Sequence, residues 1–210
     1  MQGAVLLIEA ACMTPALVIA LFQQDGDAWA LGATMLILIA IGAPLRFLVR
    51  PGERNLRARE GFLTVALAWI ALSCFGALPF VFSGMIPNYI DALFESVSGF
   101  TTTGATVLEN FDNLPQGIMF WRSFTHWIGG MGVLVLATAV LPSLGIRSHY
   151  LTQAETPGPV FSKLVPKQSQ TSKILYGIYC AMTLAEVALL KLAGMPLYDS
   201  FIHAFSTAGT

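Results

Sequence analysis

Five apolar stretches separated by polar connections dominate the pattern of the chain. They run over residues 3–22, 28–49, 61–83, 118–142 and 173–194. Each is long enough to cross a bilayer, which takes about 20 residues of α-helix. The first stretch lacks the basic leading segment and the small-residue cleavage site of a signal peptide, so we expect it to be a spanning helix. The pattern predicts an all-α polytopic membrane protein.

The polar connections differ in charge, and the difference predicts their side of the membrane. Residues 50–60 and 147–173 are basic, whereas residues 23–27 and 83–117 contain Asp and Glu but no Lys or Arg. Together with Arg46, the basic connections hold nine of the eleven Lys and Arg residues. Basic loops remain in the cytoplasm by the positive-inside rule. We therefore expect a multi-pass protein of the cytoplasmic (inner) membrane with its N-terminus in the cytoplasm.

Residues 83–117 are too many for a simple connection between two spans. Residues 88–99 have apolar positions at helical spacing, and either Asn88 or Asp91 is placed to cap the start. Such a helix is about half a membrane span long. A polar string follows it, from Thr101 to Thr106. This order predicts a re-entrant loop: a short pore helix and then a return to the side on which it began.

The same plan starts again near residue 173. A short helix is predicted over residues 197–204, and the pattern F-[ST]-T-x-G occurs at 100–104 and again at 205–209. The chain therefore contains an internal repeat. We divide the chain into a leading two-helix transmembrane pair (1–55), a first helix–pore loop–helix repeat (56–145), a cytoplasmic loop (146–172) and the start of a second repeat that is cut off in its pore loop (173–210).

The amino-acid composition excludes several classes of protein. Hydrophobic residues make up 55% of the chain and charged residues 11%, against about 25% charged in a typical soluble protein. The mean hydropathy is +0.69 and the net charge is −1. These values exclude a disordered chain, a nucleic-acid binder and most soluble enzymes. Cys12, Cys74 and Cys180 form no CxxC motif, so we expect buried free thiols.

The Thr/Gly strings carry the candidate chemistry. Non-helical backbone is tolerated inside a bilayer only where it is buried in protein or lines a watery path. There, its carbonyl oxygens can replace the hydration shell of an alkali cation, and glycine permits the backbone angles that this requires. A Ser/Thr/Gly run between helices is more often an ordinary loop. Two similar strings, each after a short helix on the same side, favour a cation filter.

Residues 91–145 resemble a known family. The runs SGFTTTGAT and FWRSFTHWIGGMG, with YDSFIHAFSTAGT later in the chain, resemble the TrkH/KtrB/HKT superfamily of potassium transporters, and its TrkH branch in particular. The resemblance implies four helix–pore helix–helix repeats around one pore, as in potassium channels, and potassium uptake rather than enzyme activity. It covers the whole chain. Because the chain stops near the midpoint of a usual member, we expect an N-terminal fragment of a longer protein.

The resemblance also implies the filter residues. The first filter is Thr102, Thr103 and Gly104, flanked by Thr101 and Ala105. Two registers are open for the second filter. The F-[ST]-T-x-G match places it at Thr207, Ala208 and Gly209, whereas a register two residues later uses Gly209 and Thr210. We favour the later register, in which potassium binds the backbone carbonyls of Thr102, Thr103, Gly209 and Thr210.

Selectivity depends on position 104. Gly104 matches the potassium-selective pattern of the superfamily, whereas a serine there would suggest its sodium-carrying members. A sodium-permeable or weakly selective cation transporter of the same superfamily is therefore the alternative function. Two further classes, an intramembrane enzyme and an assembly subunit without transport, are open, but no His/Asp/Glu cluster has the spacing of a catalytic or metal site.

Arg122 and the glycines after it are the candidate supports of the pore loop. A charge at the outer start of a span costs free energy unless it is paired or reaches water. Arg122 either forms a salt bridge with Glu95 or Glu109 that braces the pore loop, or extends into water. Gly129, Gly130 and Gly132 are expected to allow close packing against the pore loop.

The resemblance implies the partners as well. We expect membrane lipid around the chain, a homodimer for the full-length protein, and a cytosolic nucleotide-binding regulatory subunit of the TrkA type. Potassium is the transported ion, by symport or in a channel-like mode, and no cofactor is expected in this chain. No nucleic-acid partner is expected.

Overall fold

The computed structural model describes residues 2–47, 58–111, 114–140 and 168–209. All regular secondary structure in these ranges is helical, which confirms the predicted fold class. The helices are α1 (Gln2–Cys12), α2 (Thr14–Gln23), α3 (Ala28–Phe47), α4 (Ala58–Gly76), α5 (Leu78–Phe82), α6 (Tyr89–Phe100), α7 (Gln116–Val140), α9 (Gln168–Leu192) and α10 (Leu197–Gly209).

Four helical segments in the described part of the chain are long and apolar enough to cross a membrane. They are Gln2–Gln23, Ala28–Phe47, Leu63–Phe82 and Lys173–Leu192, and they coincide with four of the five predicted spans. The fifth predicted span corresponds to α7, which has 25 residues but is not among these four. Helix α7 contains Arg122 and His126 and packs between α6 and α10.

The first and third spans each contain a local break. Helices α1 and α2 are separated at Met13, just before Pro15, which lies in the first turn of α2. The backbone N–H of Met13 still donates to the Glu9 carbonyl (3.0 Å), and that of Leu17 donates to the Met13 carbonyl (3.0 Å). A proline lacks the N–H that would continue the helix, so the span breaks locally but keeps most of its hydrogen bonds.

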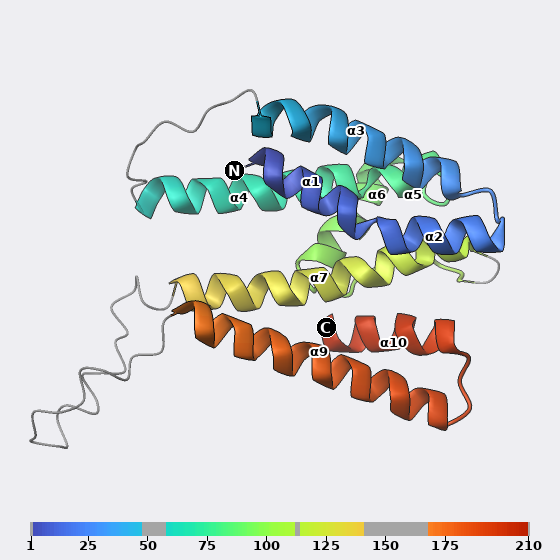
Figure 1. The fold of residues 1–210 in the computed structure, drawn as a ribbon. Helices are drawn as coiled ribbons and strands as arrows, with labels where there is room; N and C mark the ends of the chain where they lie inside the picture. The colour runs from blue at the N-terminus through green and yellow to red at the C-terminus, as the bar shows by residue number, and fades with distance from the viewer. Residues whose placement is uncertain (1, 48–57, 112–113, 141–167, 210) are drawn as a thin grey trace, which may run out of the picture.

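The helices run back and forth along one direction (Figure 1). The end of α3, the start of α4, the end of α7 and the start of α9 lie towards one end of the molecule. The N-terminus lies beside the end of α3, where Gly3 packs against the backbone of Leu45 and Arg46. The short helices α6 and α10 both begin at the opposite end. At about 1.5 Å per residue, their 12 and 13 residues cannot cross a bilayer core.

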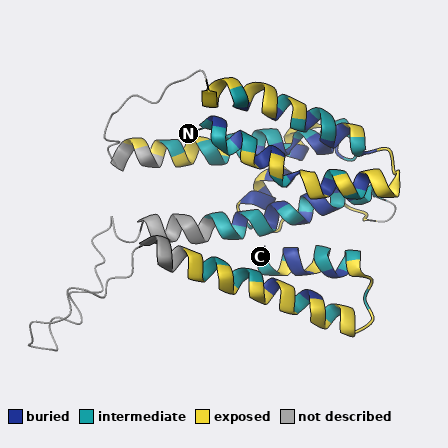
Figure 2. Cartoon of the chain, viewed as in Figure 1, coloured by how far each residue is buried: buried dark blue, intermediate teal, exposed yellow. Residues whose placement is uncertain are grey.

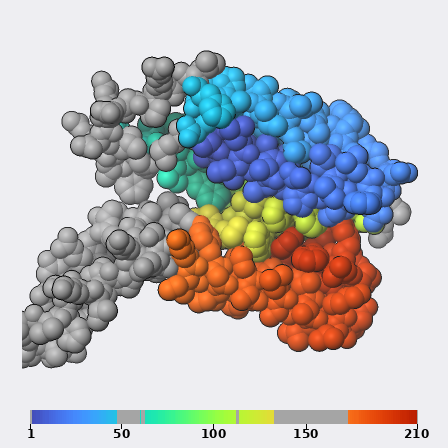
Figure 3. All heavy atoms as spheres, in the orientation of Figure 1, coloured from blue at the N-terminus to red at the C-terminus, as the bar shows by residue number. Residues whose placement is uncertain are grey.

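The outer faces of the bundle are apolar and exposed, whereas the centre is closely packed. Figure 2 shows exposed residues along α3 and α9 and buried residues where α6 and α7 meet. Leu36 on α3 and Leu189 on α9 are more than 60% exposed. Figure 3 shows α7 between α1–α3 on one side and α9 and α10 on the other. An exposed apolar surface of this extent is that of a protein surrounded by lipid.

The N-terminus of α7 is capped by carboxylates from the α2–α3 connection. The backbone N–H of Gln116 donates to Asp25 Oδ2 (3.2 Å), and that of Ile118 donates to Asp27 Oδ2 (3.1 Å). The hydroxyl of Tyr198 on α10 donates to the Gln116 carbonyl (2.6 Å). Helix N-termini leave N–H groups unpaired and attract negative charge. Burial raises the pKa of Asp27 above its ordinary value, and the hydrogen bond from Ile118 opposes that shift.

Replacing Asp27 should destabilise the protein more than replacing Asp25. Asp27 is 2% exposed, so Asp27→Ala leaves a buried N–H of Ile118 without an acceptor and should lower the free energy of unfolding by about 1–3 kcal/mol. Asp25 is exposed, and water can replace its carboxylate in Asp25→Ala. Thermal unfolding of the purified protein in detergent measures both, with Asp27→Asn, which keeps an acceptor, as the control. Equal losses in the two alanine variants would contradict this assignment.

Candidate ion filter

The first Thr/Gly string follows directly from the end of α6. The helix runs from Tyr89 to Phe100, one residue beyond the predicted end, and Asn88 is its cap: the Asn88 side chain accepts a hydrogen bond from the N–H of Ile90 (3.0 Å). Of the two predicted caps, the structure uses Asn88. Beyond Phe100 the chain leaves the helix and forms no regular secondary structure as far as position 111.

The backbone of the string turns its N–H groups towards α6. Thr101 donates to the Val97 carbonyl (2.9 Å), Thr102 to the Gly99 carbonyl (3.0 Å) and Thr103 to the Ser98 carbonyl (2.9 Å). With the N–H groups committed to the end of the helix, the string can present carbonyl oxygens on its other side. That is the arrangement which a carbonyl-lined cation site requires.

Two left-handed residues shape the string. Thr102 has φ +60° and Gly104 has φ +76°. A left-handed conformation is natural for glycine but strained for threonine, by about 1–2 kcal/mol. Strained backbone persists only where the surrounding contacts hold it, and such residues cluster at functional sites. The strain at Thr102 therefore coincides with a predicted filter residue.

A buried ion pair holds the string in place. Arg122 Nε on α7 donates to Glu95 Oε1 on α6 at 2.5 Å, and the two side chains are 12% and 1% exposed. Of the two predicted acidic partners, the structure pairs Arg122 with Glu95. The other oxygen, Glu95 Oε2, accepts hydrogen bonds from Thr106 Oγ1 and from the N–H of Val107 (3.0 Å each). One carboxylate therefore joins α6, α7 and the segment that follows the Thr/Gly string.

Sequence reasoning missed the role of Ser98. Its hydroxyl donates to the Ala105 carbonyl at 2.6 Å, so the α6 helix holds the far end of the string as well as the near end. This hydrogen bond makes the Ala105 carbonyl less available to an ion than those of Thr102 and Thr103. Ser98 has no distinguishing sequence signal, because a serine in a short helix is compatible with many roles.

Gly129, Gly130 and Gly132 of α7 each pack against a different partner. A side chain at Gly129 would overlap the Phe100 carbonyl, so this glycine allows α7 to contact the residue before the string. This confirms the predicted close packing for Gly129. Gly130 instead faces the Tyr179 hydroxyl of α9, and Gly132 faces the Trp69 ring of α4.

The second Thr/Gly string differs from the first. Helix α10 continues to Gly209, so Thr207, Ala208 and Gly209 are helical, and the predicted helix end at Ala204 is five residues too early. The earlier register, Thr207 to Gly209, therefore lies inside a helix. The corresponding residues of the first unit, Thr102 to Gly104, lie outside one. The physical reason is packing. Phe205 is only 8% exposed, and its ring centroid lies 5.2–5.6 Å from those of Phe120, Phe124 and Trp127 on α7.

Aligning the two short helices argues against the earlier register but falls one residue beyond the later one, in which Gly209 is level with Thr102. Each has an aspartate in its first turn, Asp91 in α6 and Asp199 in α10. This alignment places Gly209 level with Thr101 and Thr210 level with Thr102. Thr210 lies outside the described residues. The later register stays a prediction.

The described residues contain no group of three or more His, Cys, Asp or Glu side chains that could hold a metal ion. Cys12, Cys74 and Cys180 are free, as predicted, but half-buried rather than buried. Within the described residues, the candidate ion-binding oxygens therefore belong to the Thr/Gly string rather than to a cluster of acidic side chains.

Comparison with known proteins decides the family. The family model described as TrkH, a cation transport protein, matches residues 30–210. The chain belongs to the TrkH family. Its members are cation transport proteins rather than enzymes, as the sequence predicted.

Individual TrkH relatives match nearly all of this chain. It is 45% identical over 206 residues to the Trk system potassium uptake protein TrkH of Salmonella typhimurium, covering 97% of this chain and 42% of that protein. It is 39% identical to TrkG of Escherichia coli, covering 99% of this chain and 43% of that protein. The chain therefore spans about two fifths of the length of these relatives.

A solved TrkH structure has the same fold. The crystal structure of the potassium transporter TrkH from Vibrio parahaemolyticus matches with a TM-score of 0.82 and 38% identity, over 98% of this chain and 41% of that one. The match confirms the predicted all-α, multi-helix membrane fold.

Removing both members of the ion pair should cost less than the sum of the two single removals. Glu95→Gln or Arg122→Met each leaves a buried charge unpaired, and each should lower the free energy of unfolding by about 3–5 kcal/mol. The combined variant leaves neither charge, so its loss should be smaller than the sum. The free energies of unfolding of the two single variants and the combined variant, measured in detergent, form a double-mutant cycle. Pairing Arg122→Met with Glu109→Gln, at an exposed acid, is the control and should be additive. Additive losses for Glu95 and Arg122 would show that the pair is not coupled.

Proposed function

We propose that this chain provides one complete filter segment, and part of a second, of a pathway through which potassium enters the cell. The observation that carries the proposal is the Thr101–Ala105 string. Its first N–H groups donate into the end of α6, and Glu95 and Ser98 hold the return segment. The names of the relatives as potassium uptake proteins support potassium as the ion.

The mechanism follows from the orientation of the string and its helix. A potassium ion loses its water shell on entering the filter, and the carbonyls of Thr102 and Thr103 replace part of it. In the later register, Gly209 and Thr210 supply carbonyls from the second segment. Helices α6 and α10 end at or just before these residues, and the negative ends of their dipoles favour a cation there.

Gly104 favours potassium over the sodium-permeable alternative. Its φ of +76° lies in the left-handed region, which glycine adopts without a steric cost. A serine at this position would strain the backbone beside the carbonyls of the filter. Because glycine occupies the position, a potassium-selective filter is the better-supported function.

The architecture belongs to the same proposal. Residues 1–55 form a leading helix pair, residues 56–145 a first repeat with re-entrant helix α6, residues 146–172 a cytoplasmic loop, and residues 173–210 the start of a second repeat. The N-terminus and both basic connections lie in the cytoplasm, and the membrane is the inner one. Supporting this orientation, the N-terminus and the helix ends joined by the basic connections lie towards one end of the molecule (Figure 1).

Membership of the TrkH family also suggests the partners of the complete transporter. We infer that the complete transporter is a homodimer and that a cytosolic nucleotide-binding subunit of the TrkA type regulates it. The basic connections, on the cytoplasmic side, are the surfaces available to such a subunit. Arg122 and Glu95 support the filter but do not bind the ion themselves.

Gly104→Ser should lower the preference for potassium over sodium. A side chain forced into the left-handed region costs about 1–2 kcal/mol, which corresponds to about a tenfold change in an equilibrium. We expect the ratio of potassium to sodium uptake to fall by about that factor. The measurement is radiotracer uptake by the complete protein that carries this sequence, in cells that lack their own potassium-uptake systems.

Gly84 offers a matched control for this experiment. It has the same φ of +76° but lies in the connection before α6, with open space around it. Gly84→Ser should strain the backbone equally and leave the ion preference unchanged. An unchanged ratio in Gly104→Ser, or an equal fall in both variants, would remove Gly104 from the filter.

The proposed orientation predicts which positions an impermeant reagent can reach. In a background without the three native cysteines, Asn110→Cys should react with an impermeant thiol reagent applied to whole cells, because it lies outside. Ser169→Cys should react only after the cells are permeabilised. Mass spectrometry or gel-shift labelling measures both. The reverse pattern would place the N-terminus outside the cell.

A further inference from the structure

His126 is a buried residue of α7 that lies against the ends of both short helices. It is 3% exposed and follows Arg122 by one helical turn. A Cβ added at Gly99, near the end of α6, would lie 3.8 Å from His126 Cδ2, which is an ordinary contact distance. A Cβ added at Gly209, at the end of α10, would come within 2.5 Å of the His126 carbonyl oxygen and 2.8 Å of His126 Cβ. One residue therefore meets the ends of α6 and α10.

The backbone and the ring of His126 make different contacts. The backbone and Cβ lie against Gly209, which belongs to the second filter in either register. The imidazole ring extends to Gly99, three residues before Thr102 of the first filter. The buried Nδ1 atom has no hydrogen-bond partner among the described residues. No hydrogen bond through Nδ1 therefore fixes the ring, and its position depends on packing.

The two short helices are placed relative to each other through α7. In the described part of the chain, α6 and α10 both pack mainly on α7 or on spanning helices rather than on each other. Thr125 and Gly129 of α7 face the end of α6. Gly130 faces the end of α10, whereas His126 faces both ends. The His126 ring is thus a spacer between the residues that lead into the two filters.

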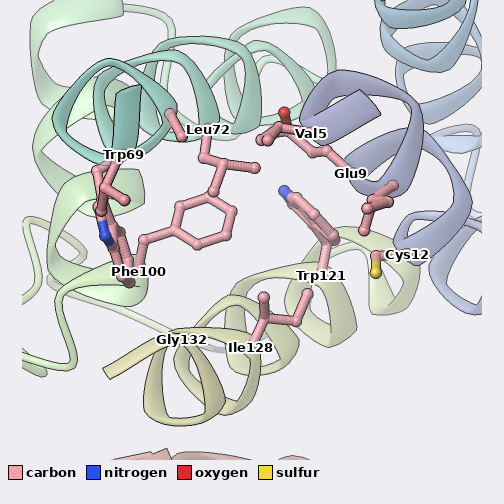
Figure 4. Close-up of a pocket in the computed structure, with 12 residues that line it drawn as sticks. Val5, Glu9, Cys12, Trp69, Leu72, Phe100, Trp121, Ile128 and Gly132 are labelled. Carbon is pink, nitrogen blue, oxygen red and sulfur yellow. The ribbon is translucent and has the colours of Figure 1, made fainter. Parts of the chain in front are cut away.

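Both short helices are also held by contacts that do not involve His126. Phe100 of α6 is fully buried, and its ring packs edge-on against Trp121 of α7, with 6.2 Å between the ring centroids. Figure 4 shows these two rings beside a cavity between α1, α4 and α7. Phe205 of α10 packs among three aromatic rings of α7. Removing the His126 ring should therefore leave both helices in place while their ends shift.

We propose that His126 determines ion specificity by setting the distance between the two filter segments. A carbonyl filter distinguishes potassium from sodium by the size of the site or by the field of its carbonyls, and both depend on this distance. Binding groups must be held within about 0.5 Å of their working positions, so a small shift is enough. The inference rests on the proposed potassium filter and adds a positioning residue that does not bind the ion.

A series of side-chain sizes at position 126 tests this role. His126→Ala keeps the Cβ on which Gly209 rests but removes the ring, and the space that a buried ring leaves collapses in part. The filter segments should then approach each other, and the ratio of potassium to sodium uptake should fall at least about fivefold. His126→Phe should move them apart and raise the ratio of rubidium to potassium uptake. His126→Asn, intermediate in size, should give an intermediate potassium-to-sodium ratio.

The measurement is competitive radiotracer uptake by the complete protein at about pH 8, where an imidazole is uncharged. His203→Ala is the matched control, because His203 is an exposed histidine of α10, and it should leave both ratios unchanged. Loss of stability alone lowers the uptake of every ion and does not make the ion preference follow side-chain size. Unchanged ratios, or a shift towards the same ion in the alanine and phenylalanine variants, would overturn the proposal.

Two comparisons separate this inference from the proposed function. If Gly104→Ser changes the potassium-to-sodium ratio and the His126 series does not, the filter assignment stands and the spacer role is wrong. If neither changes the ratio, both are wrong. Cryo-electron microscopy of the complete His126→Ala protein measures the distance between the Gly99 and Gly209 Cα atoms without a transport assay. We expect this distance to shorten, and an unchanged distance would show that His126 is not the spacer.

Discussion

The carboxylate of Glu95 is the contact on which the geometry of the Thr/Gly string depends. It pairs with Arg122 of α7 and accepts hydrogen bonds from Thr106 and Val107 beyond the string. A carboxylate that is 2% exposed is costly to bury unless its oxygens have partners. Because all its partners lie on other segments, the satisfied charge fixes α6, α7 and the return segment relative to one another.

Helix α7 is the surface on which both short helices rest. On one side, Gly129 allows its backbone to meet the Phe100 carbonyl at the end of α6. On the other, Gly209 at the end of α10 lies against the backbone of His126. The rings of Phe120, Phe124 and Trp127 surround Phe205 of α10. The two candidate filter segments are therefore positioned against the same short part of one helix.

The N-terminal end of α7 is also held by contacts with other segments. Carboxylates of the α2–α3 connection accept its first N–H groups, and Tyr198 of α10 donates to the Gln116 carbonyl. These contacts join the α2–α3 connection, α7 and α10 at one place. Helix ends in or near a membrane need such partners, because little water is available to satisfy them. The α2–α3 connection thus supports α7 and α10 without contacting the Thr/Gly string at 101–106 through these hydrogen bonds.

The sequence by itself determined the features that depend on local pattern. Apolar runs of sufficient length predicted the spans, Asn88 before a periodic segment predicted the start of α6, and the Thr/Gly string with its flanking motifs predicted the family. Tertiary structure decided the rest. It chose Glu95 over Glu109 as the partner of Arg122, extended α10 to Gly209 through the packing of Phe205, and left Glu9 unpaired beside a cavity. Each of these depends on contacts between segments far apart in the chain, and the spacing of residues along the chain carries no information about them.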